Sequence, residues 1–124
     1  MNKLVFAVAY LIVDVIWIST MSRFFYQQRI ETIQKAPLRF ALIPAVLAYV
    51  TLLITMFFVC GPLAAYYRPR LHPSIVFALV GFCLYGVYNF TNAAIFNEYD
   101  YTFVTVDTLW GVVSFAFFGY LYSL

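Results

Sequence analysis

The chain has 124 residues, of which 65% are hydrophobic and only 10% are charged. Soluble domains carry about 25% charged residues, and a soluble fold of this length could not bury so much apolar surface, so the composition excludes a soluble globular protein. The formal net charge of +2 is too small to indicate nucleic-acid binding. The two cysteines form no Cys-x-x-Cys motif and no Cys/His cluster, so we expect no metal site, and no motif calls for a cofactor.

Four apolar stretches are long enough for membrane helices, which need about 20 mostly apolar residues each. They cover residues 4–21, 38–60, 74–96 and 102–122. Because backbone groups in lipid must be hydrogen-bonded within the protein, each stretch is expected to be an α-helix. The sequence therefore predicts an all-α fold, an integral membrane four-helix bundle in which residues 1–124 form a single transmembrane domain.

The connections between these stretches leave several alternatives open. Residues 22–35 are polar with interspersed apolar positions, so they form either a short amphipathic helix on the membrane surface or a solvated loop. Pro37 suits the first turn of the second helix, whereas Pro44 would lie inside that helix and kink it. At Gly61 and the proline after it, the second helix either ends or continues to Tyr67.

Two carboxylates fall inside predicted membrane helices, Asp14 in the first and Asp107 in the fourth, and no lysine or arginine lies near mid-span to pair with them. A charged side chain at mid-bilayer costs about 2.5 to 3.5 kcal/mol, so intramembrane ionisable residues are candidates for function. Each aspartate begins the same pattern, Asp-x-x-Trp, with Trp17 and Trp110 three residues later. Residues at this spacing share a helix face, and a buried indole N–H seeks an acceptor.

Depth along each helix brings the carboxylates to the level of two amides. Each residue advances a helix by about 1.5 Å, which places Asp14, Asn89 and Asn92 beyond the middle of their spans. The first and third helices run in the same direction and the fourth runs back, so Asp107 lies at the same level. We therefore predict one intramembrane polar cluster, which serves as structural glue between helices, as a ligand, proton or catalytic site, or as a subunit interface. Its members are Asp14, Trp17, Tyr88, Asn89, Thr91, Asn92, Asp107 and Trp110.

Several of these residues belong to an ordered set of motifs. The set consists of Asp14-x-x-Trp17, the pair Phe25-Tyr26, Tyr88-x-x-Thr91-Asn92-x-Ala94, and Val104-Thr105-Val106-Asp107-x-x-Trp110-Gly111. It resembles a family of small four-helix membrane proteins catalogued as domain of unknown function 2177, and the resemblance covers nearly the whole chain. It implies a membrane location and this topology, with no established activity, cofactor or catalytic residue. Family members often have Asp where this chain has Asn89, which removes one possible acid here.

Three functions remain open. The near absence of residues outside the membrane helices favours a non-catalytic membrane component, such as an accessory subunit of a larger membrane complex. Alternatively, Asp14 and Asp107 serve as general acid and base in an enzyme that acts on a lipid or another apolar substrate, or as titrating groups in a small proton-linked carrier. The expected partners are membrane lipids together with other membrane subunits or a second copy of the chain.

Overall fold

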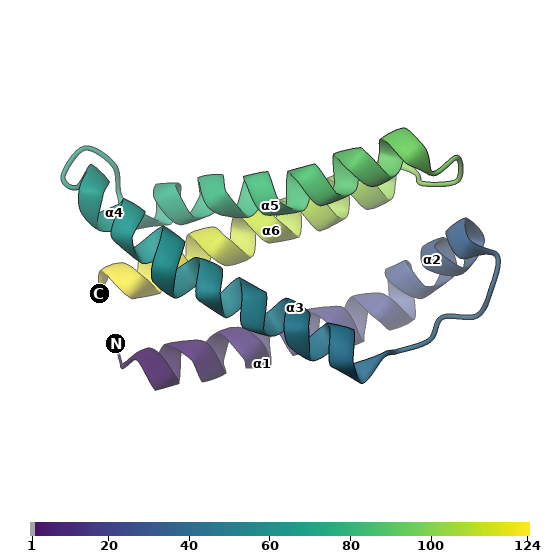
Figure 1. Ribbon diagram of the computed structural model, residues 1–124, viewed down its shortest axis with the longest axis horizontal. Helices are drawn as coiled ribbons and strands as arrows, with labels where there is room; N and C mark the ends of the chain where they lie inside the picture. The colour runs from purple at the N-terminus through teal and green to yellow at the C-terminus, as the bar shows by residue number, and fades with distance from the viewer. Residues whose placement is uncertain (1) are drawn as a thin grey trace.

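The computed structural model describes residues 2–124, and within them every regular element is a helix (Figure 1). Its elements are α1 (Lys3–Met21), η1 (Ser22–Tyr26), α2 (Gln27–Gln34), α3 (Leu42–Ile54), η2 (Thr55–Cys60), α4 (Gly61–Tyr67), α5 (Pro73–Ile95) and α6 (Tyr101–Ser123). These join into four helices that are long and apolar enough to cross a membrane: Lys3–Gln34, Leu42–Tyr67, Pro73–Ile95 and Tyr101–Ser123. The predicted all-α, four-span architecture is confirmed.

The first helix does not end where its apolar stretch ends. It continues through η1, a π-helical turn in which the backbone N–H of Gln27 donates to the carbonyl of Ser22, and then through α2. Residues 22–35 are therefore mostly helical, and the loop alternative is wrong. A π-helical turn inserts one residue into the helix, which changes the direction in which the following side chains point.

The second helix begins later and ends later than the predicted span 38–60. Leu38 belongs to the preceding connection, where its backbone N–H donates to Glu31 Oε2 at 2.8 Å. Because α3 begins at Leu42, Pro44 lies in the first turn rather than inside the helix, where a missing N–H removes no helical hydrogen bond. The helix then continues past Gly61 to Tyr67.

The segment η2 explains how a helix continues through a proline. Pro62 has no N–H, and in a regular α-helix its ring would collide with the carbonyl four residues earlier. Immediately before it, the chain is π-helical from Thr55 to Cys60, and the N–H of Gly61 donates to the carbonyl of Met56. The wider turn relieves the clash, so α4 can follow without a break.

The helices α5 and α6 pack as a close antiparallel hairpin, as Figure 1 shows. Glycines make this approach possible: a Cβ atom on Gly81 would overlap the carbonyl oxygen of Gly111 and lie 2.8 Å from Phe115 Cβ. At the far end of the hairpin, a Cβ on Gly119 would lie 2.8 Å from Phe77 Cβ. Small residues at such positions are the usual means of close helix packing in membranes.

The tight core lies at the end of the bundle that carries both chain termini. Its fully buried side chains include Tyr10, Met56, Cys60, Phe77, Phe115 and Phe118. At the other end, α3 has no buried residue and diverges from the hairpin of α5 and α6 (Figure 1). At this other end α3 therefore lies apart from the α5/α6 hairpin (Figure 1).

Candidate functional site

The two Asp-x-x-Trp patterns meet across the helix interface rather than each pairing within its own helix. Trp110 Nε1 of α6 donates to Asp14 Oδ1 of α1 at 2.8 Å. The rings of Trp17 and Trp110 stack in parallel, with centroids 4.1 Å apart and an interplanar angle of 1°. Asp14 is only 2% exposed, so the indole N–H supplies a donor to a carboxylate that is removed from solvent.

Tyr26 connects the tryptophan pair to the second carboxylate. Trp17 Nε1 donates to the Tyr26 hydroxyl oxygen at 3.3 Å, and that hydroxyl donates to Asp107 Oδ1 at 3.1 Å. An indole N–H can only donate, so the Tyr26 hydroxyl accepts a hydrogen bond from Trp17 and donates one to Asp107. Tyr26 is the last residue of η1 and is buried, so the π-helical turn ends at a side chain that faces the interior of the bundle.

Asn89 completes the environment of Asp107 from α5. Its Nδ2 donates to Asp107 Oδ2 at 2.7 Å and to the carbonyl of Tyr85 at 2.9 Å, and its Oδ1 accepts from the Tyr99 hydroxyl at 2.7 Å. The Tyr85 carbonyl can only accept, which fixes the orientation of the amide. Both oxygens of Asp107 therefore accept from donors of the protein.

Tyr99 lies in the connection between α5 and α6, outside the membrane helices. Burial, together with the charges of Asp107 and Asp100, raises the pKa of Tyr99 to about 12. Its hydroxyl therefore keeps its proton at physiological pH and remains the donor to Asn89. The connection thus covers the polar cluster on its outer side.

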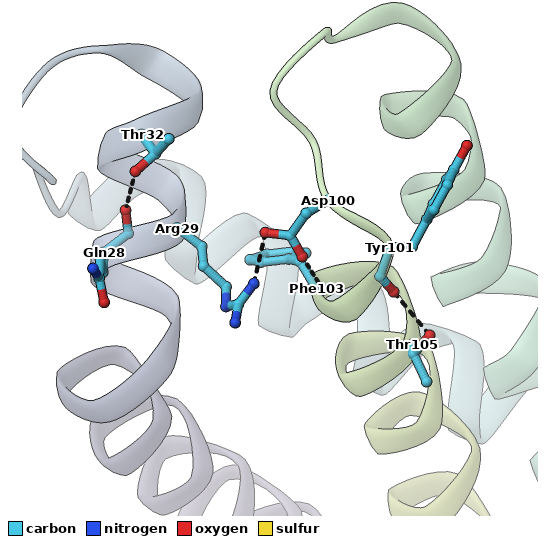
Figure 2. A network of polar contacts seen from close by, with 7 residues as sticks. All are labelled: Gln28, Arg29, Thr32, Asp100, Tyr101, Phe103 and Thr105. Carbon is cyan, nitrogen blue, oxygen red and sulfur yellow. Dashed lines mark hydrogen bonds and ion pairs between the residues drawn. The ribbon is translucent and has the colours of Figure 1, made fainter.

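An ion pair at the same end of the bundle joins α2 to α6, as Figure 2 shows. Arg29 Nη1 lies 2.7 Å from Asp100 Oδ2, and the guanidinium lies 4.2 Å from the centre of the Phe25 ring. The other oxygen of Asp100 accepts from the backbone N–H of Phe103 at 2.6 Å and caps α6. Since both charged side chains are about one third exposed, the pair contributes less than about 1 kcal/mol to stability, but it places α2 beside the start of α6.

A cavity of about 550 Å³ lies beside the polar cluster, at the end where α3 diverges. All four membrane helices line it: Asp14 comes from α1, Tyr49 from α3, Tyr85 and Tyr88 from α5, and Asp107 from α6. Its other lining residues are mostly apolar, and none of the lining residues is Lys, Arg or His. A cavity of this size that is apolar apart from a few polar groups is typical of a small-molecule site.

The structure brings together five of the eight residues predicted for the polar cluster: Asp14, Trp17, Asn89, Asp107 and Trp110. The other three contribute less. Tyr88 lines the cavity but is 58% exposed. Thr91 is exposed, and Asn92 is half-buried and lies close to the hydroxyls of Tyr88 and Tyr99.

Sequence reasoning missed three participants, Tyr26, Tyr85 and Tyr99. Tyr26 belongs to the aromatic pair Phe25-Tyr26 of the motif set. Because its stretch is predicted as a surface helix or a loop, the sequence does not indicate that its side chain faces the interior of the bundle. Tyr85 contributes a backbone carbonyl and a wall of the cavity, and no side-chain pattern could identify its role as an acceptor.

Comparison with known proteins agrees with this architecture. A family model described as predicted membrane protein (DUF2177) matches residues 1–123. No curated protein and no solved structure matches the chain.

Proposed function

The chain belongs to the DUF2177 family of predicted membrane proteins, and we propose that it binds one lipid-type molecule in the cavity between α1, α3, α5 and α6. The observation that carries the proposal is the composition of that cavity: Asp14 and Asp107 lie in a wall that is otherwise mostly apolar. A long apolar molecule with one polar end matches both parts of such a wall. The carboxylates hold the polar end, and the apolar residues of α3 contact the chain.

The divergence of α3 provides the route of entry. No residue of α3 is fully buried, and the side chains of this helix that pack against the core, Leu52 and Leu53, lie near its C-terminal end. A molecule dissolved in the bilayer enters beside α3 without crossing water. At about 550 Å³, the cavity holds the polar end and the adjoining part of a single hydrocarbon chain.

Native mass spectrometry of the protein extracted in a mild detergent tests the proposal. We expect the wild-type chain to carry one lipid molecule. Ala45 lines the cavity, so Ala45→Phe fills it and should release the lipid. Val46 is 50% exposed and does not line the cavity, so Val46→Phe adds a similar volume on the lipid-facing side and should retain it. A wild-type protein without lipid, or equal retention by both variants, would contradict the proposal.

The same measurement addresses the prediction of an accessory subunit. The observation in its favour is the exposed N-terminal part of α3, where Leu42, Ile43 and Leu47 are each more than half exposed, a surface that suits a partner helix as well as lipid. A reproducible larger assembly without bound lipid would favour that function.

The same cavity also supports the enzyme and carrier alternatives, because both predicted carboxylates line it. For the enzyme, a lipid change on expression that disappears in both Asp14→Asn and Asp107→Asn is the expected result. For the carrier, it is pH-driven flux in liposomes that is lost in the same two variants. If both variants match the wild type in these assays, the enzyme and carrier functions are contradicted.

A further inference from the structure

The charged groups that line the cavity indicate which polar end its ligand should carry. Two carboxylates line it, and none of its lining residues is cationic. The only ion pair within residues 2–124 joins Arg29 to Asp100, and neither residue lines the cavity. Charges in a low-dielectric interior are costly unless they are paired. A ligand that brings a positive charge would therefore lower the free energy of the site.

The two carboxylates differ in how many further hydrogen bonds they can accept from a ligand. Asp107 accepts from Tyr26 on one oxygen and from Asn89 on the other. Asp14 accepts only on Oδ1, from Trp110. The Tyr49 hydroxyl lies close to Asp14, and the one regular hydrogen bond of this buried carboxylate ends on Oδ1. Its Oδ2 therefore keeps room for a further donor.

We propose that the ligand is a single-chain amphiphile with an amino group, and that its ammonium donates to Asp14 Oδ2. This inference rests on the proposed lipid-binding function and specifies the class of ligand. An ammonium group has three donors and no acceptor, so it supplies a further hydrogen bond to Asp14 together with the positive charge that no lining residue of the cavity provides. Aromatic faces attract ammonium groups as well, and Tyr49, Tyr85 and Tyr88 all line the cavity.

Other polar ends fit this cavity less well. A hydroxyl would satisfy Oδ2 as a donor but would leave the carboxylate charge unpaired. A phosphate would bring a negative charge next to Asp14 and Asp107, and like charges in such a setting repel each other strongly. We therefore expect an order of affinity in which the amine binds most tightly, the alcohol less tightly and the phosphate least.

Tryptophan fluorescence provides a readout confined to this site. The chain has two tryptophans, and both belong to the stacked pair whose Trp110 contacts Asp14. Purified full-length protein in a neutral detergent is titrated with a long-chain primary amine, the alcohol of the same chain length and the corresponding alkyl phosphate. We expect a saturable change with the amine and an affinity for the alcohol at least about tenfold weaker.

Three variants separate the contact with Asp14 from general effects. Asp14→Asn keeps an acceptor for Trp110 but removes the charge, and it should weaken amine binding about tenfold to a hundredfold. Ala45→Phe leaves Asp14 intact and should abolish the amine response by filling the cavity. Glu98→Gln removes an exposed carboxylate outside the cavity and should bind the amine like the wild type, which controls for unspecific attraction of a cationic amphiphile.

The outcomes distinguish this inference from the proposed function. Equal affinity for amine and alcohol, or an Asp14→Asn variant that binds the amine like Glu98→Gln, would overturn the inference, while lipid retention in native mass spectra would leave the binding function standing. A wild-type protein that retains no lipid and responds to none of the three amphiphiles would overturn both.

Discussion

Replacing Trp110 with phenylalanine removes the donor to Asp14 and keeps an aromatic ring in the stack with Trp17. The lost hydrogen bond is short, 2.8 Å, and its acceptor is a carboxylate that is 2% exposed. Hydrogen bonds to charged groups contribute about 1.5 to 3 kcal/mol, whereas neutral ones contribute about 0.5 to 1.5 kcal/mol. Because the side chain of Asp14 is buried, we expect Trp110→Phe to lower the free energy of unfolding by at least about 1.5 kcal/mol.

The matched control is Trp17→Phe. It removes the same indole area from the same stack, but its hydrogen bond is longer, 3.3 Å, and ends on the neutral hydroxyl of Tyr26. Polar contacts between membrane helices average only about 0.6 kcal/mol, and this bond should lie near that value. The loss of ring area cancels between the two variants, so Trp110→Phe should be more destabilising by about 1 kcal/mol.

Unfolding in mixed micelles of increasing dodecyl sulfate content, followed by circular dichroism, measures these differences. A double-mutant cycle with Asp14→Ala then isolates the pair, because the coupling free energy between Trp110 and Asp14 should be about 1 kcal/mol or more. If both tryptophan variants lose the same stability and the coupling is zero, the hydrogen bond contributes nothing and the reasoning about the buried carboxylate is wrong.

Two further predictions follow from the packing and from the outer edge of the cluster. Gly111→Ala places a Cβ against the ring of Tyr85 and should cost about 1 to 3 kcal/mol in the same unfolding assay. A Cβ on Gly86 would lie 3.3 Å from the Phe90 ring and 4.0 Å from Phe82, so Gly86→Ala should be nearly neutral. Equal losses would refute close packing at Gly111. Tyr99→Phe should destabilise the protein at neutral pH by about 1 kcal/mol, because Asn89 Oδ1 loses its donor. Since the pKa of Tyr99 is raised from 10.0 to about 12, the stabilisation is fully present below pH 10 and is lost as the pH rises through about 12. The free energies of unfolding of the wild type and Tyr99→Phe should therefore converge over that interval. A constant difference would argue against the assigned hydrogen bond.

Composition and hydropathy determined the fold class, because the cost of exposing backbone and polar groups to lipid acts on each segment separately. The spans 74–96 and 102–122 agree with α5 and α6 to within one residue at each end. Helix direction and rise per residue also placed Asn89 and Asp107 at one level, and the structure joins them at 2.7 Å. These properties depend only on the order of residues along each helix.

Which faces of the helices meet was decided by tertiary packing. The spacing of Asp14 and Trp17 indicates a shared face, but only the approach of α6 to α1 shows that Asp14 binds Trp110 instead. The inward turn of Tyr26 depends on a π-helical insertion, whose small local energy leaves no pattern in the sequence. The cavity arises because α3 diverges from its neighbours at one end, while the glycines of α5 and α6 allow these two helices to pack closely. The relative positions of helices far apart in the chain follow only from the packing of all four together.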